Sequence, residues 1–224
     1  MNSIKNRPPI EYQRKWCKFL GRKFYVDERV HIPRKNTEPL VEFALQYIKQ
    51  LKRNVACADV GTGAGVIAIS LVLESPHVVK VFAIDLFAEA LEVAKKNVKK
   101  YKLKGKVILK KGNLLTPIKN EKVEIIVANL PHASKETFES KSRLAIEPKL
   151  GVLAGRSGLE IIEAFLKQLV RYKKFSQSIA IMFLKISPDR AHETIKLVRK
   201  HLSSAIVETK LDIERKPRYL IVKF

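Results

Sequence analysis

Residues 58–66 read Ala-Asp-Val-Gly-Thr-Gly-Ala-Gly-Val, a loop in which every second residue from the first glycine onward is glycine. An apolar run, residues 55–58, leads into this loop, and an amphipathic run, residues 66–73, follows it. A second apolar run, residues 78–84, ends at Asp85. This order predicts a strand, a tight turn, a helix and a second strand that carries an acid at its carboxyl end. Such an acid can accept hydrogen bonds from both hydroxyls of a ribose, while the glycines let the backbone approach the rest of a nucleoside.

The spacing of the glycines separates two classes of nucleoside ligand. Dinucleotide-binding loops read G-x-G-x-x-G, and their third glycine lets the helix pack closely on the strand. Here residues 61–65 read G-T-G-A-G, and Asp59 stands two residues ahead of the first glycine. This pattern resembles motif I of the S-adenosylmethionine-dependent methyltransferases, with Asp85 in the place of their ribose-binding acid. A glycine loop alone is also compatible with an ordinary tight turn, and the two acids at these distances favour the cofactor site.

Strands and helices alternate along most of the chain. Helices are expected at 38–51, 64–74, 87–102, 158–171 and 189–202, and strands at 55–60, 79–84, 106–110, 123–128, 178–186, 205–211 and 218–223. This alternation predicts an α/β fold in which a mostly parallel sheet is covered on both faces. Only residues 212–217 separate the last two strands, which is too short for a parallel crossover, so these strands should pair antiparallel. A doubly wound, seven-stranded sheet that ends in an antiparallel hairpin resembles the Rossmann-like class I methyltransferases.

The length of 224 residues suffices for one domain of ordinary size. We expect an S-adenosylmethionine-dependent methyltransferase domain over residues 51–224 and a short N-terminal extension over residues 1–50. The extension should contain a short strand or hairpin at 23–32 and the helix at 38–51. No apolar run approaches the ~20 residues that span a bilayer, and the polar, basic N-terminus has no signal-peptide pattern. The two cysteines show no metal-ligand spacing, so we expect reduced thiols, no metal site and a cytoplasmic protein.

A second site is predicted after the fourth strand of the sheet. Residues 123–128 are apolar apart from Glu124, and they lead into Asn129-Leu130-Pro131-His132. An asparagine at the carboxyl end of a strand offers an acceptor and a donor that can pair with a planar amide or an amino-heterocycle. The carbonyl of the residue before the proline could accept a hydrogen bond from the same nitrogen, and the imidazole could stack on the planar group. A polar turn after a strand is the plain alternative.

This tetrapeptide is similar to the Asn-Pro-Pro-Tyr signature of methyltransferases that modify nitrogen in a planar group. Further segments resemble one family, the HemK/PrmC-type protein-(glutamine-N5) methyltransferases. They are residues 19–26 and 32–38 ahead of the glycine loop, Gly-Asn-Leu-Leu at 112–115, and the stretches 147–148, 153–155 and 158–162. The resemblance runs from about residue 19 to the C-terminus. It implies a substrate glutamine in the Gly-Gly-Gln motif of a peptide-chain release factor, or in a ribosomal protein.

The resemblance also assigns site residues by position. Those that would hold or border S-adenosylmethionine are Asp59, Gly61, Thr62, Gly63, Ala64, Gly65, Asp85, Leu86, Asn113, Leu114 and Asn129. Those that would grip the substrate amide and form the catalytic group are Asn129, Leu130, Pro131 and His132.

The chain departs from the family pattern mainly on the substrate side. Leu130 replaces a proline, and His132 replaces a tyrosine. Asn113 stands where the family has an aspartate, and Lys35-Asn36 stands where it has Pro-Glu. Residues 185–187 read Lys-Ile-Ser in place of Glu-Ile-Gly. Because only about fifty residues precede the first sheet strand, we expect the family's helical N-terminal domain to be missing or reduced.

The charge is strongly positive and unevenly distributed. The chain has 44 Lys and Arg against 22 Asp and Glu, a formal net charge of +22. Residues 1–35 contain ten basic and three acidic residues, and residues 95–111 contain nine lysines and no acid. These two segments favour contact with a polyanion, RNA or the ribosome ahead of a membrane. A solvated helix face accounts for the lysines of the second segment equally well.

Three functions remain open at the level of the sequence. The first is methylation of a glutamine amide in a translation protein, which the family resemblance favours. The second is methylation of an amino group in RNA or DNA, which the charge of +22 favours. The third is a cofactor-binding homologue that has lost catalysis, for which the changes at Leu130 and His132 argue.

Overall fold

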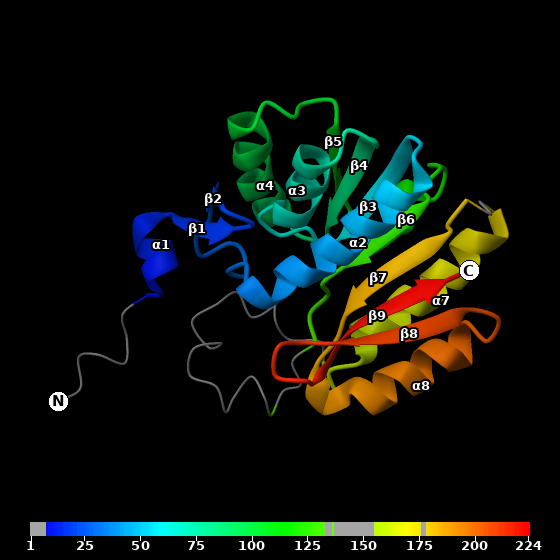
Figure 1. Cartoon of the computed structure of the whole chain (residues 1–224). Helices are drawn as coiled ribbons and strands as arrows, with labels where there is room; N and C mark the ends of the chain where they lie inside the picture. The colour runs from blue at the N-terminus through cyan, green and yellow to red at the C-terminus, as the bar shows by residue number, and fades with distance from the viewer. Residues whose placement is uncertain (1–7, 133–135, 137–154, 176–177) are drawn as a thin grey trace.

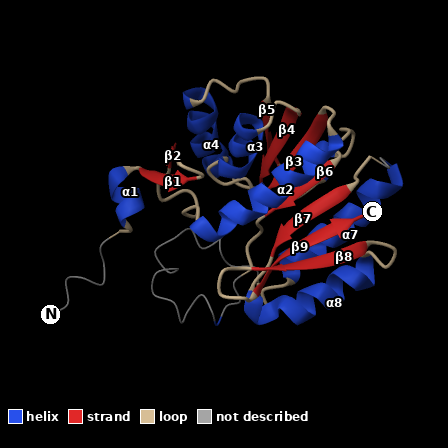
Figure 2. Cartoon of the chain, viewed as in Figure 1, coloured by secondary structure: helices blue, strands red, loops and turns tan. Residues whose placement is uncertain are grey.

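The fold is a seven-stranded sheet with helices on both faces and a small hairpin at one side (Figures 1 and 2). The computed structural model describes residues 8–132, 136, 155–175 and 178–224. Its strands are β1 (Trp16–Phe19), β2 (Arg22–Tyr25), β3 (Val55–Val60), β4 (Val78–Asp85), β5 (Val107–Lys111), β6 (Ile125–Ala128), β7 (Ile181–Lys185), β8 (Ile206–Leu211) and β9 (Pro217–Lys223). Its α-helices are α1 (Ile10–Arg14), α2 (Glu38–Leu51), α3 (Val66–Glu74), α4 (Ala88–Lys100), α7 (Glu160–Phe175) and α8 (Ala191–His201). Short 3-10 helices are η1 (Lys35–Thr37), η2 (Thr116–Ile118) and η4 (Pro188–Arg190).

The order of strands in the large sheet is β5-β4-β3-β6-β7-β9-β8. The first five strands in this order pair parallel with their neighbours. β9 pairs antiparallel with both β7 and β8, so the sheet ends in an antiparallel hairpin. The structure therefore confirms the predicted α/β class, the doubly wound arrangement and the antiparallel pairing of the last two strands.

Alternate residues of each central strand feed two separate hydrophobic clusters. On β3, Cys57 belongs to the cluster under α2, α3 and α4, whereas Ala58 belongs to the cluster under α7 and α8. Both residues have no exposed surface, as expected for a strand that is buried on two faces. Figure 1 shows these two helical layers on opposite sides of the sheet.

The N-terminal hairpin corrects one prediction. We expected a short strand or hairpin at 23–32, but the two strands are β1 and β2, and residues 26–32 form no strand. The turn lies at Leu20 and Gly21, whose φ angles of 43° and 76° are both positive. Two positive φ angles match the twist of a two-residue hairpin, and this places the turn ahead of the predicted segment. The apolar residues Val26, Val30 and Ile32 are buried without strand pairing.

Asn97 of α4 fixes the hairpin to α4 and to the glycine loop. Its Oδ1 accepts a hydrogen bond from the Tyr25 amide at 2.7 Å, and its Nδ2 donates to the carbonyls of Tyr25 and Ala64 at 2.9 and 2.8 Å. Phe19 and Phe24 of the hairpin lie in the same hydrophobic cluster as α2 and α3. The boundary between residues 50 and 51, which the sequence suggested as the start of the methyltransferase domain, stays a prediction.

The order in which strands are added to the sheet reverses at β3. The chain proceeds from β3 to β4 and β5 on one side, and then β6 pairs with the other side of β3. In open α/β sheets, ligands bind at the carboxyl ends of the strands where such connections diverge. Within the parts of the chain that the structure describes, no helix is both long enough and apolar enough to cross a bilayer.

Candidate functional site

A cavity of about 630 Å³ lies at the carboxyl ends of β3, β4 and β6. Most of the residues proposed from the sequence line it. These are Gly61, Thr62, Gly63, Ala64, Asp85, Leu86, Asn113, Leu114, Asn129, Leu130 and Pro131. Three do not line it: Asp59, Gly65 and His132. The parallel strands thus bring together residues that are far apart in the sequence, which is what the patterns at their carboxyl ends suggested.

The glycine loop turns tightly between β3 and α3. The amides of Gly61 and Thr62 both donate to the carbonyl of Ile84 at 2.9 Å, so the loop is tied to the end of β4. Gly61 has φ of 77°, and a Cβ added there would lie 3.3 Å from the Leu130 side chain. Glycine is required at this position because of both the backbone conformation and the close approach of the segment after β6.

Asp59 is completely buried beneath this loop. Its Oδ2 accepts hydrogen bonds from the Thr62 hydroxyl at 2.6 Å and from the Ala68 amide at 3.1 Å. Burial, only partly offset by these two hydrogen bonds, raises the pKa of Asp59 to about 7. Asp59 therefore braces the loop against α3 and does not reach the cavity surface.

Asp85 occupies the cavity wall at the end of β4. Its Oδ2 accepts from the Gly63 amide at 2.9 Å, and its Oδ1 accepts from the Phe87 amide at 3.1 Å. Burial raises the pKa of Asp85, while these amides act in the opposite direction. Because each carboxylate oxygen can accept more than one hydrogen bond, both oxygens can still accept from the hydroxyls of a ligand.

The segment after β5 forms an apolar part of the wall. Leu114 has an unusual positive φ of 54° for a leucine, and its side chain is nearly buried. Asn113 is exposed, and Leu86, which also lines the cavity, keeps 51% of its surface exposed. Exposed apolar surface next to a polar amide suits a flat heterocycle that is apolar on its faces and polar at its edge.

The Asn129–His132 tetrapeptide leaves the end of β6 along the cavity. Leu130 is buried and packs on Gly61. His132 turns back on the tetrapeptide, since its Nδ1 lies 2.8 Å from the Leu130 carbonyl. Burial, together with the nearby Lys185, lowers the pKa of His132 to about 4, so the ring is neutral near pH 7. A carbonyl can only accept, so Nδ1 carries the proton, and one acceptor position of the Leu130 oxygen is already used.

Several wall residues were not proposed from the sequence. Arg29, His31 and Thr37 line the cavity from the N-terminal side, and Glu160 and Ile161 line it from the start of α7. The family-like segments 32–38 and 158–162 pointed to these neighbourhoods but gave these residues no role. Glu160 caps its own helix, because its carboxylate accepts from the amides of residues 157–159. The family-like stretches 147–148 and 153–154 lie outside the described residues.

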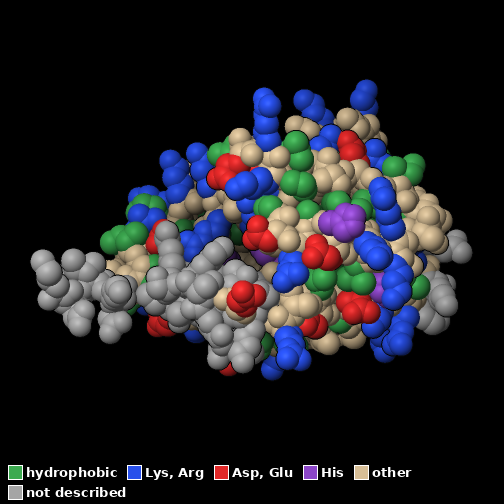
Figure 3. Space-filling view, turned by 90° about the horizontal axis from the view of Figure 1, so that it is seen from below, with side chains coloured by type: hydrophobic (Ala, Val, Ile, Leu, Met, Phe, Trp, Pro, Cys, Tyr) green, Lys and Arg blue, Asp and Glu red, His purple; other side chains and the backbone are tan. Residues whose placement is uncertain are grey.

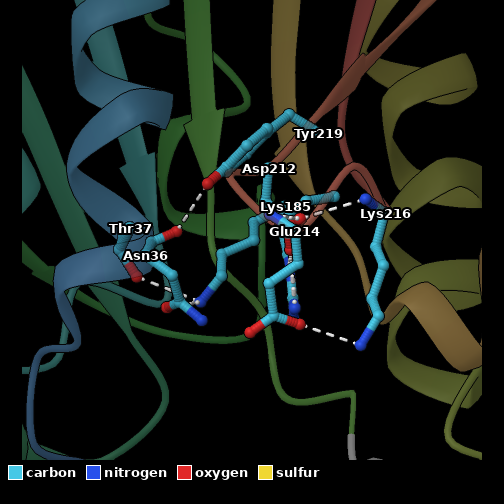
Figure 4. A network of polar contacts seen from close by, with 8 residues as sticks. Asn36, Thr37, Lys185, Asp212, Glu214, Lys216 and Tyr219 are labelled. Carbon is cyan, nitrogen blue, oxygen red and sulfur yellow. Dashed lines mark hydrogen bonds and ion pairs between the residues drawn. The ribbon is translucent and has the colours of Figure 1, made fainter.

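A partly buried polar network joins β7 to η1 beside the cavity (Figure 4). Lys185 Nζ donates to Asn36 Oδ1 at 3.0 Å and to Thr37 Oγ1 at 3.1 Å. The Tyr219 hydroxyl donates to the Asn36 carbonyl at 3.0 Å. Burial lowers the pKa of Lys185 to about 7, and Arg218 and Arg34 add to that effect. Two positions at which the chain departs from the family pattern, Asn36 and Lys185, are therefore hydrogen-bonded to each other.

Comparisons with known proteins agree on the kind of domain. A family model described as the methyltransferase small domain matches residues 40–147. The release factor glutamine methyltransferase of Bacillus cereus is 32% identical over 221 residues, which cover 96% of this chain and 76% of that protein. The protein of the same name from Streptococcus pneumoniae is 36% identical over 217 residues, which cover 96% of this chain and 74% of that protein. The chain spans about three quarters of the length of these relatives.

A solved structure adds a likeness in fold. The ribosomal protein L11 methylase from Lactobacillus delbrueckii subsp. bulgaricus has a TM-score of 0.61 with this chain at 18% identity, covering 88% of this chain and 83% of that one. At this identity the likeness concerns the fold alone. The curated relatives, at 32% and 36% identity over nearly the whole chain, decide the family. This protein belongs to the release factor glutamine methyltransferases, a family of enzymes that take their methyl group from S-adenosylmethionine.

Proposed function

We propose that this protein methylates the side-chain amide nitrogen of a glutamine in a peptide-chain release factor. One observation carries the proposal: Asn129 and Asp85, which stand at the ends of two different strands, line one cavity. The cavity thus combines acceptors for a ribose with acceptors for an amide. The names of the curated relatives supply the substrate class. Since release factors act on ribosomes, we propose that the protein works in the cytoplasm.

The wall residues divide the cavity into parts that fit S-adenosylmethionine. Asp85 would accept from the two ribose hydroxyls. Leu86, Asn113 and Leu114 would border the adenine, where the Asn113 side-chain oxygen can accept one bond from the amino group. The backbone of residues 61–64 would lie along the methionine part. The bound cofactor supplies a methyl group on a sulfonium, which is already activated for transfer.

The side chains near Asn129 would orient the amide nitrogen. An amide nitrogen is a poor nucleophile because its lone pair is delocalised into the carbonyl. Two acceptors, the Asn129 side-chain oxygen and the second lone pair of the Leu130 carbonyl, would hold the NH₂ group in place. They would also stabilise the positive charge that develops on nitrogen as the N–C bond forms and the S–C bond breaks. The extra proton then leaves the nitrogen for solvent, so the neutral His132 needs to take no proton.

The decisive experiment offers labelled S-adenosylmethionine and two pools of substrate to the purified protein. One pool is a release factor, and the other is total RNA from the same cell. Label on the release factor that disappears when its Gly-Gly-Gln glutamine is changed to alanine supports the proposal. Label on RNA would replace it with the amino-methyltransferase alternative. Binding of the cofactor without label in either pool would leave the homologue that has lost catalysis.

We also propose a contact with RNA or the ribosome through the two basic segments, because the fold brings them together. The hairpin β1–β2 packs on α4, where Lys100 Nζ and the Tyr101 hydroxyl donate to the carbonyl of Lys23. The described part of the first basic segment, residues 8–35, therefore meets residues 95–111 on one side of the molecule, although about 60 residues of sequence separate them. Figure 3 shows how widely Lys and Arg side chains project on another face.

Aromatic rings are interleaved with the cations of this composite surface. The Arg14 guanidinium lies 3.9 Å from the centre of the Trp16 ring, and Lys23 Nζ lies 4.4 Å from it. Lys96 Nζ lies 4.2 Å from the centre of the Tyr25 ring. Rings among cations suit unpaired bases as well as phosphates, which favours RNA over a purely acidic surface. Several acids pair with cations of the two segments and reduce the charge only locally, among them Glu28 with Lys15, Glu74 with Arg22, Asp27 with Arg29 and Glu92 with Lys95.

A further inference from the structure

Arg29 is held against the cavity by a buried carboxylate. It follows β2 in the chain and lines the cavity. Its Nε donates to Asp27 Oδ1 at 2.9 Å, and its Nη2 donates to Asp27 Oδ2 at 2.5 Å. Asp27 is only 3% exposed and also accepts from the Tyr25 hydroxyl at 2.8 Å. Two bonds in a fork fix the plane of the guanidinium, so its direction is set before any ligand arrives.

The fork leaves part of the guanidinium available. Among the described residues, none accepts a hydrogen bond from Nη1 of Arg29. The Arg29 side chain is about one third exposed, against 5% for that of Asp27. Asp27 balances the positive charge of Arg29, but the outer N–H groups of the guanidinium point away from Asp27. An acceptor in the cavity can therefore take hydrogen bonds from Arg29 without breaking the contact with Asp27.

Apart from Arg29, the described residues of the cavity wall are acidic or neutral. Its described residues include the carboxylates of Asp85, Glu89 and Glu160, while Arg29 is the one that always carries a positive charge. This is unexpected in a chain with a net charge of +22. A ligand carboxylate would be repelled by Asp85, which is better suited to hydroxyl donors. Arg29 offers the opposite chemistry, with charge and N–H donors in the geometry that matches a carboxylate.

We propose that Arg29 binds the α-carboxylate of the methionine part of S-adenosylmethionine and of its product, S-adenosylhomocysteine. The proposal rests on the cofactor placement given under the proposed function. Asp85 then selects the ribose in the middle of the ligand, and Arg29 selects the amino-acid end. Asp27 is a positioning residue, since it acts on the ligand only through the orientation of Arg29.

The test measures binding without any methyl acceptor. Calorimetry compares S-adenosylhomocysteine with its decarboxylated form, which keeps the amine and lacks the carboxylate. Arg29→Gln should weaken binding of S-adenosylhomocysteine about tenfold or more, as expected for a charge-assisted hydrogen bond. The same change should alter binding of the decarboxylated ligand by no more than about twofold. Arg29→Lys should recover part of the loss, because it keeps the charge and loses the fork.

Arg53→Gln is the matched control, since Arg53 pairs with Glu124 at the far end of β3 from the cavity. It should leave both affinities unchanged. Because Arg29→Gln leaves the buried Asp27 unpaired, the double variant Asp27→Asn/Arg29→Gln serves if the single variant does not fold. If Arg29→Gln weakened binding of S-adenosylhomocysteine and of the decarboxylated ligand by the same factor, the proposal would be overturned. A wild-type protein that binds the decarboxylated ligand as tightly as S-adenosylhomocysteine would also overturn it.

These outcomes are independent of the choice of substrate. A wild-type protein that binds neither ligand would contradict the proposed methyltransferase function and the role of Arg29 together. A protein that binds S-adenosylhomocysteine but shows no dependence on Arg29 would contradict only the present inference.

Discussion

Asp59 shows what burial does to a carboxyl group at this site. Its folded pKa of about 7 lies above the value of an unfolded chain, near 3.9. Between these values the folded state binds a proton that the unfolded state does not, so the free energy of unfolding falls as pH rises through this window. Above pH 7 the loss is complete.

We expect Asp59→Asn to remove this dependence, because an amide keeps an acceptor for Thr62 and the Ala68 amide and does not ionise. From pH 5 to pH 8 the variant should gain stability relative to wild type by on the order of 2 kcal/mol, as measured by urea unfolding. Asp59→Ala is the control and should be less stable than wild type at both pH values, since it loses both hydrogen bonds. A parallel pH dependence in wild type and Asp59→Asn would contradict the assignment.

Lys185 should produce the opposite trend. Its pKa of about 7 lies below the ordinary value of 10.5, so between these values the unfolded state binds more protons. Stability contributed by this group therefore rises with pH from about 7 to about 10. Around it stand the charged or titratable side chains Arg34, His132, Asp212, Arg218 and Tyr219.

Lys185→Met should abolish this rise, which we expect to be on the order of 2 kcal/mol between pH 7 and pH 9.5 in wild type. Urea unfolding at the two pH values measures it. Lys216→Met is the matched control, because Lys216 is an exposed lysine that pairs with Glu214 near the same network (Figure 4). If the control changes the slope as much as Lys185→Met does, another group is responsible.

Asn129 is the residue on which the proposed transfer depends most. Asn129→Ala should lower kcat by about a hundredfold or more, since it removes an acceptor aimed at the nitrogen that becomes positive. Affinity for S-adenosylhomocysteine should change little, because Asp85 and the glycine loop remain. Single-turnover kinetics and calorimetry separate the two effects. Asn54→Ala, at an exposed asparagine before β3, should leave both unchanged.

Among the elements, α4 has a structural task beyond covering the sheet. Asn97 joins it to the hairpin through Tyr25 and to the glycine loop through Ala64. Asn97→Ala would leave a buried amide and two carbonyls without these partners, at a cost of about 2–3 kcal/mol. Amide hydrogen exchange should then accelerate in β1 and β2 more than in β3 or β4. If amide exchange accelerated equally in all strands, Asn97 would support the whole fold and not specifically the contact between α4 and the hairpin.

The elements also show what the sequence could and could not reveal. The bounds of α2 and β3 agree with the predicted 38–51 and 55–60, since periodicity and flanking turns mark them locally. Asp85 and Asn129 could be placed at one site because parallel strands end at the same edge of the sheet. No sequence pattern indicated that Arg29 lines the cavity or that Lys185 bonds Asn36, 149 positions away. Both contacts depend on tertiary packing, which leaves no local pattern in the sequence.

At the scale of the whole molecule, the composite basic surface makes a prediction about salt. Affinity for ribosomal RNA should fall linearly with salt on logarithmic axes, because each phosphate contact releases a counterion. A variant with glutamine at Lys95, Lys99, Lys102 and Lys104 should lose affinity, and its slope should decrease by about 0.7 for each contact removed. Filter binding over a range of salt concentrations measures both.

The control carries glutamine at Lys119, Lys122, Lys196 and Lys200, which are exposed and lie outside the hairpin and residues 95–111. It has the same net charge as the first variant. Equal losses of affinity in the two variants would mean that the overall net charge of +22 drives RNA binding. The composite basic surface would then have no specific role.

The position of β9 affects how the sheet is completed during folding. β9 is the last strand in the chain, yet it lies between β7 and β8. Until β9 inserts, β8 lacks the strand with which it pairs, and the edge of β7 beside it also stays open. Open strand edges are templates for pairing with other chains. A folding intermediate in which β9 has not yet inserted therefore has two unpaired strand edges, and at this stage the protein is most exposed to aggregation.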